Sequence, residues 1–310
     1  MFYLVLRRLL AAIPTLIGVT IILFIALRML PGDPVGVILA GAPATPEVAE
    51  ELRRQFGLDR SLLAQYFIYL GGILTGDLGT SYATRQPVAE LIAQQFWPTI
   101  TLALAAALIS ATVGIILGSF AAIYRHKWPD VIVRVLSLIS TSAPSFWVGL
   151  LLIMVFAFGL GWFPAAGGGG LRALVLPAVA LGLSAAGTVT RLVRNSVIDV
   201  LGENFVTALE AKGISRTSIV MKHVLRNAVI PTVTIVGLQL GALVAGAVIV
   251  EAVFARQGLG QMLVQGVASS DFPVIQGVVL VIAVIYIVIN ILVDLSYAVI
   301  DPRVRQSARS

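Results

Sequence analysis

The sequence predicts an all-α membrane protein with six transmembrane helices, on the basis of its hydropathy, its low charge and its long apolar runs. Of the 310 residues, 58% are hydrophobic and 12% are charged, and the mean hydropathy is +0.99. A soluble domain carries about a quarter charged residues, so this chain is expected to fold in a bilayer. Helices are the expected spanning elements because an open sheet cannot satisfy its backbone hydrogen bonds in lipid.

Six uncharged runs are candidates to cross a hydrocarbon core of about 30 Å, which needs about 20 helical residues. The first, fifth and sixth candidate spans are residues 9–27, 227–250 and 272–293. Residues 91–124 and 135–171 contain the second and third spans, and residues 173–190 are the core of the fourth. The first run follows Arg7 and Arg8 and could be a secretory signal. It is long for that, and LRMLPGDP follows it instead of a small-residue cleavage site, so it is interpreted as a retained span.

The basic residues predict that both termini lie in the cytoplasm. With the N-terminus inside, fourteen of the 21 Lys and Arg residues fall on the cytoplasmic side. Most of the others fall in one long outer segment, where charge has little influence on topology. The net charge of +6 is therefore attributed to cytoplasmic loops and not to nucleic-acid binding.

The predicted organisation has four parts. Residues 1–30 form a cytoplasmic stub and the first span, and residues 31–95 form an extracytoplasmic segment. Residues 96–300 form the transmembrane core, and residues 301–310 a cytoplasmic tail.

The outer segment is predicted to contain short interfacial helices. TPEVAEELRRQFGL has Thr45 as an N-cap and Pro46 at the first helical position. SLLAQYFIYLGGIL and PVAELIAQQFW also show helical apolar spacing. By contrast, GWFPAAGGGG at 161–170 is expected to be an outer loop, because four glycines disfavour a helix.

The residue pattern does not indicate catalysis or metal binding. None of the three lysines follows a glycine, so there is no phosphate-cradling GxxxxGK[ST] loop. The chain has no cysteine and no HExxH pair. Its two histidines fall in short polar connections, which leaves no credible Ser-His-Asp set. The chain is therefore predicted not to be an enzyme.

Polar residues in two spans have two interpretations. In STSAPSFWVG, Pro144 is expected to kink the helix, with Ser140, Ser142 and Ser145 satisfying the freed carbonyls. Such residues either pack helices closely or line a polar path. Ser142, Ser145 and Gln239, which lies in the fifth span, are the candidate path residues.

Two acidic residues, Glu251 and Asp294, lie near span ends. Ionisable residues inside a membrane mark proton or ion pathways by default. The alternative is structural, with Asp294 bonded to a neighbouring helix or to Arg191 or Arg194.

The stretch TALEAKGISRTSIVMKHVLR, residues 207–226, is the longest polar segment in the second half of the chain. Its helix formers end at Lys212, and Gly213 is predicted to terminate the helix. A second short helix is expected from about Ser215, with that serine as its N-cap. The segment is either a solvated loop or a docking site for a partner.

This stretch resembles the EAA coupling loop of ABC-importer permeases, in the form found in the dipeptide, oligopeptide and nickel family. The general E-A-A-x-x-x-G motif falls on Thr207, Ala208, Leu209 and Gly213, where only the alanine and the glycine match. The peptide-permease variant fits better, through Ala211, Lys212, Gly213, His223, Leu225, Arg226, Asn227, Ala228 and Pro231.

Further landmarks of that family follow in order along nearly the whole chain. They are LPGDP at 30–34, FGLDRSLLAQY at 56–66, GDLGTS at 76–81, DFPVIQG at 271–277 and VDLSYAVIDPRVR at 293–305. One departure is Gln257, where the family usually has a proline.

The resemblance implies a type I ABC-importer permease whose coupling loop, at about 199–229, seats on a cytoplasmic ATPase. The coupling residues that it implies are Thr207, Ala208, Leu209, Glu210, Ala211, Lys212, Gly213, Ile214, Ser215 and Arg216. Leu209 and Ile214 are expected to supply the apolar seat, because exposed ion pairs contribute only ~0–1 kcal/mol each.

The same resemblance implies the partners and the location. The partners are a second homologous permease, two cytoplasmic ATPase subunits or domains, an extracytoplasmic substrate-binding protein and membrane lipid. No cofactor is expected in this chain, and ATP and Mg would bind to the partner ATPases. The location would be the cytoplasmic (inner) membrane of a bacterium or archaeon.

The implied substrate is a peptide, with glutathione or a nickel complex as alternatives for the same machinery. Inverted repeats and intramembrane charge would favour a different class of protein, an ion-coupled secondary transporter. Neither is evident in the sequence.

Overall fold

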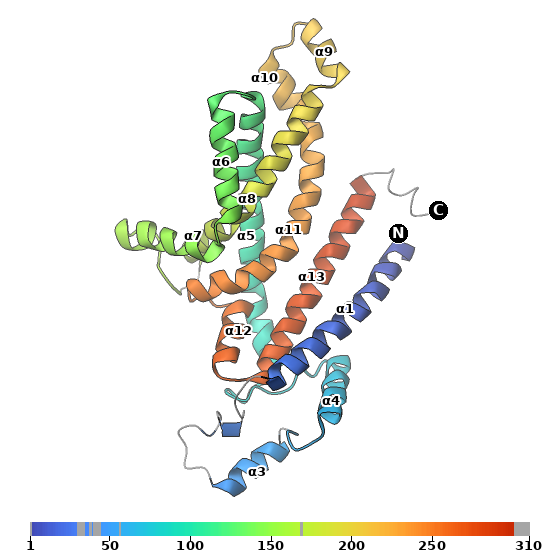
Figure 1. The fold of residues 1–310 in the computed structure, drawn as a ribbon, viewed down its shortest axis with the longest axis vertical. Helices are drawn as coiled ribbons and strands as arrows, with labels where there is room; N and C mark the ends of the chain where they lie inside the picture. The colour runs from blue at the N-terminus through green and yellow to red at the C-terminus, as the bar shows by residue number, and fades with distance from the viewer. Residues whose placement is uncertain are drawn as a thin grey trace. The chain divides into compact units, whose positions relative to one another are not determined.

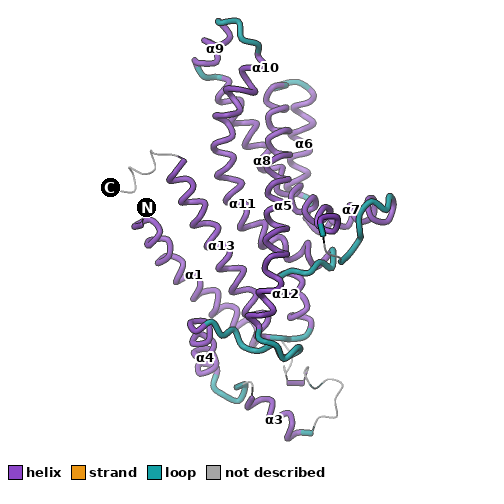
Figure 2. The backbone as a smooth tube through the Cα atoms, turned by 180° about the vertical axis from the view of Figure 1, so that it is seen from behind, coloured by secondary structure: helices purple, strands orange, loops and turns teal. Residues whose placement is uncertain are grey.

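The computed structural model describes residues 2–29, 35–36, 39, 45–55, 57–167 and 170–300. In these ranges the regular elements are helices (Figures 1 and 2), with one isolated bridge between Thr80 and Pro87. The helices of the first half are α1 (Phe2–Met29), α3 (Pro46–Gln55), α4 (Leu62–Thr75), α5 (Val88–Ile123), α6 (Trp128–Ser142) and α7 (Ser145–Leu152) with the π-helix η1 (Ile153–Gly159). Those of the second half are α8 (Leu171–Leu201), α9 (Asn204–Ala211), α10 (Arg216–Ile219), the π-helix η2 (Val220–Val224), α11 (Leu225–Val253), α12 (Leu259–Ala268) and α13 (Phe272–Ile300).

The predicted spans are all helical. Among the described residues, five helices are long and apolar enough to cross a membrane: Leu6–Met29, Val88–Ile123, Leu171–Leu201, Thr234–Val253 and Phe272–Ser296. The remaining predicted span is a pair of helices, Trp128–Ser142 and Ser145–Gly159, bent by 105° at the break. Six spans are therefore present if the bent pair crosses as one.

The break between α6 and α7 occurs at Pro144, where the sequence predicts a kink. Pro144 adopts φ −60° and ψ 137°, and Ala143 is extended too, as is expected of a residue before proline. Trp147 N and Val148 N then bond to Pro144 O as α7 begins. The kink is thus a complete interruption of the helix (Figure 2).

One compact unit consists of residues 1–6, 100–256 and 285–310. Within it α8 packs against α6, α7 and α11. Its core contains eight buried residues from several helices: Ala122, Val189, Val193, Val197, Val206, Ile219, Val224 and Ala228. Because α8 contributes three of these valines, this helix is the central support of the unit.

The other compact unit consists of residues 7–99 and 257–284. Its core joins Leu27 of α1 to Tyr82 and to Phe272 and Ile275 of α13. The Asp271 carboxylate accepts bonds from Ser81 Oγ at 2.6 Å and from the backbone N–H groups of residues 82 and 83 at 3.1 Å each. This buried carboxylate anchors the loop that precedes α5.

Two of the short helices predicted in the outer segment are confirmed, and the third differs. Helix α3 begins at Pro46 as expected, and Ser61 caps α4 by accepting a bond from Ala64 N. The stretch PVAELIAQQFW, however, is not separate, because it forms the start of the 36-residue helix α5. The LPGDP landmark and the predicted tail at 301–310 lie outside the described residues.

Candidate coupling and translocation site

The predicted coupling loop consists of two short helices at one end of α8 and α11 (Figure 1). Helix α9 ends as the sequence predicts, since Gly213 has φ +77°. Its N–H donates to Glu210 O at 2.9 Å, and Ile214 N donates to Leu209 O at 3.3 Å. These bonds close the end of the helix in the manner that a left-handed glycine allows.

The second short helix starts within one residue of its predicted position. Helix α10 begins at Arg216, and Ile219 N bonds to Ser215 O at 3.0 Å. It continues through η2 into α11, so the chain runs from the loop into the spanning helix without a break. The side chain of Arg216 lies outside the described residues.

The loop is held on the body of the protein by apolar contacts. Val206 of α9, Ile219 of α10 and Val224 of η2 are buried in the core that also contains Val193 and Val197 of α8. A displacement of α9 is therefore transmitted to α8 through a packed interface, because well-packed cores transmit strain.

The predicted coupling residues divide into an exposed set and an inward set. The exposed set comprises Thr207, Ala208, Glu210, Ala211, Lys212, Gly213 and Ser215. Leu209 and Ile214, expected to form the apolar seat for a partner, are only partly exposed and pack against the chain's own core. Any surface that α9 offers to a partner is therefore more polar than the sequence suggests.

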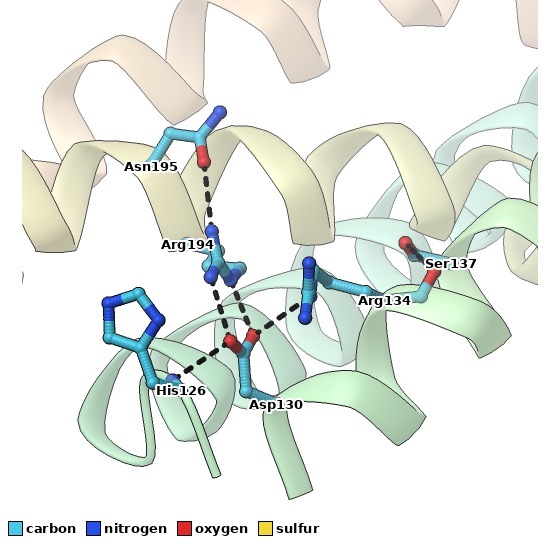
Figure 3. A network of polar contacts seen from close by, with 6 residues as sticks. All are labelled: His126, Asp130, Arg134, Ser137, Arg194 and Asn195. Atoms are coloured by element: carbon cyan, nitrogen blue, oxygen red, sulfur yellow. Dashed lines mark hydrogen bonds and ion pairs between the residues drawn. The ribbon is translucent and has the colours of Figure 1, made fainter. Parts of the chain in front are cut away.

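A polar network fixes α6 to α8 near the coupling loop (Figure 3). The Asp130 carboxylate, 1% exposed, receives two bonds from Arg194 of α8, at 2.6 and 2.8 Å. Arg134 Nε lies at 3.5 Å from the same carboxylate, and His126 N donates to it at 3.3 Å. Two cations and a backbone donor thus compensate a buried carboxylate, as a charge removed from water requires.

Further contacts extend this connection along α6. Arg191 donates to Ser137 O at 3.1 Å and to Thr141 Oγ1 at 3.2 Å. Ser140 Oγ donates to Leu183 O and accepts from Gly187 N. Ser140 therefore joins two helices, where the sequence suggested that it would satisfy a carbonyl freed by the kink.

The three candidate path residues lie near the break and in α11. Ser142 is the exposed last residue of α6, and Ser145 is the partly buried first residue of α7. Gln239 lies in α11, with a buried Oε1 that has no hydrogen-bond partner among the described residues. No hydrogen bond among the described residues joins these three side chains, and their role in a path stays a prediction.

The two acidic residues near span ends lie in different surroundings. Glu251 is fully buried, with Oε1 at 3.9 Å from Arg256 Nη1. Burial lowers the pKa of Arg256, and the nearby Glu251 opposes that shift. Asp294 is partly buried in α13, and Asn290, one turn before it, bonds to Tyr286 O of its own helix.

Sequence reasoning did not identify Asp130, the most thoroughly bonded acidic residue of the site. The sequence signal was present, because Asp130 follows Pro129 in the first turn of a helix that begins after a basic connection. Its partner Arg194 is 64 residues away, however, and only the packing of α6 on α8 brings them together.

Comparison with known proteins identifies the family. Residues 114–306 match the family described as binding-protein-dependent transport system inner membrane component. Residues 1–104 match the corresponding N-terminal family of membrane components. The chain belongs to this family, and it is a multi-pass inner-membrane permease subunit of a binding-protein-dependent ABC importer.

Curated relatives match almost the entire chain. The glutathione transport system permease protein GsiC of Escherichia coli K12 and that of Salmonella typhi are each 42% identical over 301 residues. Each match covers 97% of this chain and 98% of the relative.

A solved structure supports the fold. The inward-facing methionine ABC transporter MetNI aligns with a TM-score of 0.57 at 21% identity, over 68% of this chain and 96% of the matched chain. The predicted type I importer fold is thereby confirmed. ATP hydrolysis in such an importer belongs to separate ATPase subunits, and a substrate-binding protein delivers the solute.

Proposed function

We propose that this chain forms half of the translocation path of an importer for glutathione or a closely similar short peptide. Two observations favour this substrate class: the peptide-permease form of the coupling loop, and 42% identity to glutathione permeases over nearly the full length. A second, homologous permease completes the path. Both termini lie in the cytoplasm, as the positions of the basic residues favour.

The coupling role is proposed because most residues of helix α9 are exposed and can contact a partner. Helix α9 ends just before Gly213 and packs on α8, and α10 continues through η2 into α11, so a force on this loop reaches two long helices together. In the proposed mechanism, ATP and Mg bind to two cytoplasmic ATPase subunits or domains, whose closure moves α9. Helix α8 then moves with α6, because the Asp130–Arg194 pair and the bonds of Ser140 and Arg191 join them.

The break at Pro144 converts this movement into a change in the path. Helix α7 lies beyond the interruption and is not continuous with α6. It also packs against α8 and α11, so rotation of α8 moves both arms of the bent pair. Ser142 and Ser145 flank the interruption, which is the proposed basis for their contact with solute.

The test is uptake into proteoliposomes that contain this chain, its partner permease, the ATPases and the binding protein. Labelled glutathione, a labelled dipeptide and a nickel complex are offered separately, with ATP on the side of the ATPases. We expect ATP-dependent uptake of glutathione or the dipeptide that disappears when the ATPases are omitted.

Two results would overturn the proposal. ATP-driven uptake of nickel without either peptide would reject the substrate class while keeping the transporter class. Uptake by this chain alone under a proton gradient would reject the importer mechanism and make Asp294 and Glu251 the residues of interest.

A further inference from the structure

A second binding site is suggested by a cavity in the unit formed by residues 7–99 and 257–284. The cavity has a volume of about 310 Å³ and lies between the start of α5, helix α12 and the loop before α5. Ligand pockets in proteins begin at about this size. The coupling loop and the candidate path residues take no part in it.

Glutamine amides dominate the polar lining. Gln95 of α5 and Gln261 of α12 line the cavity, and each has a buried Oε1 without a hydrogen-bond partner among the described residues. Gln257 and Gln265 also line it and are exposed, so the cavity opens to solvent. Buried polar atoms are nearly always bonded, so two residues that line this cavity each carry an amide oxygen with an unused capacity to accept a hydrogen bond.

The charge of the cavity points to a neutral ligand group. Asp271 is its charged lining residue, and that carboxylate is already bonded to Ser81 Oγ and two backbone N–H groups. A side-chain amide donates and accepts at once, and so does a peptide bond. Met262, Leu91 and Val274 add apolar surface beside the amides.

The walls are fixed before any ligand arrives. Thr99 Oγ1 of α5 accepts a bond from Leu259 N at 2.8 Å, which holds the first turn of α12 on α5. The Asp271 bonds fix the loop on the other side. Preorganised walls reduce the ordering cost of binding.

We propose that this glutamine cavity binds the peptide bonds of a short peptide solute and leaves its charged ends in water. This inference rests on the proposed function, because it names a holding site for the same class of solute on the extracytoplasmic side. A peptide loop of the binding protein has the same amide chemistry, and the test separates that source from the solute.

The test uses the absence of cysteine from this chain. Gln257→Cys places a single thiol on the exposed edge of the cavity, in the full importer complex purified without binding protein. The rate of labelling of this chain by a maleimide is measured with increasing S-methylglutathione, whose thiol is blocked. An equimolar mixture of glutamate, S-methylcysteine and glycine supplies similar charges without peptide bonds.

We expect S-methylglutathione to slow the labelling and the amino-acid mixture to leave it unchanged. Gln95→Met and Gln261→Met keep the side-chain volume and remove the amide. In the Gln257→Cys background each should raise the concentration for half-protection about fivefold, roughly the factor of one hydrogen bond. Gln94→Met is the matched control, since Gln94 is exposed beside Gln95 and does not line the cavity. It should leave protection unchanged.

Other outcomes would overturn the inference. One is that S-methylglutathione does not slow the labelling, or that the amino-acid mixture slows it equally. Another is that the Gln95→Met and Gln261→Met variants need the same concentration for half-protection as Gln257→Cys alone. A third is that only the binding protein slows the labelling. If glutathione uptake succeeds in proteoliposomes while protection fails, the cavity proposal is wrong and the proposed function stands. If uptake of both peptides fails, the proposed function itself is wrong.

Discussion

At the scale of single residues, Gly213 is the position where backbone conformation matters most. Its φ of +77° is unfavourable for a residue with a Cβ, and open space surrounds the place where that Cβ would lie. A substitution therefore acts through the backbone, at a cost of about 1–2 kcal/mol. We expect Gly213→Val to insert and assemble normally but to lose most ATP-dependent uptake while ATP hydrolysis continues.

The measurement is the ratio of solute imported to ATP hydrolysed in proteoliposomes. Gly71→Val is the control, because Gly71 is helical, has equally open surroundings and has no positive φ. Gly213→Asn should recover part of the coupling, since asparagine tolerates the left-handed region. Normal coupling in Gly213→Val would show that the end of α9 has no role in transmission.

Substitution of Asp130 is expected to lower the stability of the protein more than the other changes considered at single residues. Asp130→Asn leaves the Arg194 guanidinium, whose side chain is 16% exposed, without its close counter-charge. Removing one partner of a buried pair costs about 3–5 kcal/mol. We expect a clear fall in the apparent melting temperature of the detergent-purified complex, partly recovered in the Asp130→Asn, Arg194→Gln double variant.

An exposed ion pair provides the comparison for Asp130. Glu50 lies 3.9 Å from Arg53, and both side chains are about half exposed, at 52% and 44%. Exposed pairs contribute about 0–1 kcal/mol, so Glu50→Gln should leave the melting temperature nearly unchanged. Equal effects of the two substitutions would contradict the assignment of Asp130 as a buried anchor.

These residues also show what the sequence could and could not reveal. The end of α9 was predictable because it depends on the local rule that glycine adopts positive φ at a helix terminus. The inward packing of Leu209 and Ile214 was not, since it depends on valines of α8 that are close only in the folded chain. The role of Asp130 could not be predicted for the same reason, because its partner Arg194 lies 64 residues away in the sequence.

At the scale of elements, close contact between α6 and α8 is the feature to test. A Cβ at Gly187 would lie 2.9 Å from Ser140 Oγ and 3.0 Å from Thr141 Cγ2, and closer still to Ser137 O. The backbone oxygen cannot rotate away, so Gly187→Ala must push α6 from α8. Overpacking of this kind costs about 1–3 kcal/mol.

The expected result for Gly187→Ala is a lower melting temperature and slower uptake. Gly18→Ala is the matched control, because Gly18 is also in a helix but has no atom within 4 Å of the added Cβ. Alanine is about 1 kcal/mol better than glycine in a helix, so the control should be neutral or slightly stabilising. If Gly187→Ala instead raised the melting temperature, the close packing of α6 on α8 at this position would be contradicted.

The helices were largely predictable from the sequence, but the geometry of the connections between them was not. Apolar length marks each span, and Pro144 marks the break, since both are properties of the local sequence. The 105° bend is set by the packing of α7 on α8 and α11. Helix α5 is longer than expected because its first turns continue directly into the span, through Pro98, which lies inside the helix without ending it.

At the scale of the whole molecule, the bent pair decides the side on which the coupling loop lies. If α6 and α7 cross the membrane together, residues 125–127 and 160–167 lie on opposite faces, and α9 returns to the face of residues 125–127. If the pair is re-entrant, α8 starts on the same face as α6, and α9 lies on the opposite one. Coupling to a cytoplasmic ATPase requires the first arrangement when the N-terminus is inside.

Single cysteines in this cysteine-free chain distinguish the two arrangements. The substitutions are Asp59→Cys, Lys127→Cys, Ala166→Cys and Thr207→Cys, each in intact cells treated with a membrane-impermeant maleimide. We expect residues 59 and 166 to be labelled at once, and residues 127 and 207 only after the membrane is permeabilised. Labelling of 127 and 166 on one face would make the bent pair re-entrant. Immediate labelling of 207 would place α9 beyond the reach of a cytoplasmic ATPase, because a helix end cannot contact a partner across a hydrocarbon core of about 30 Å.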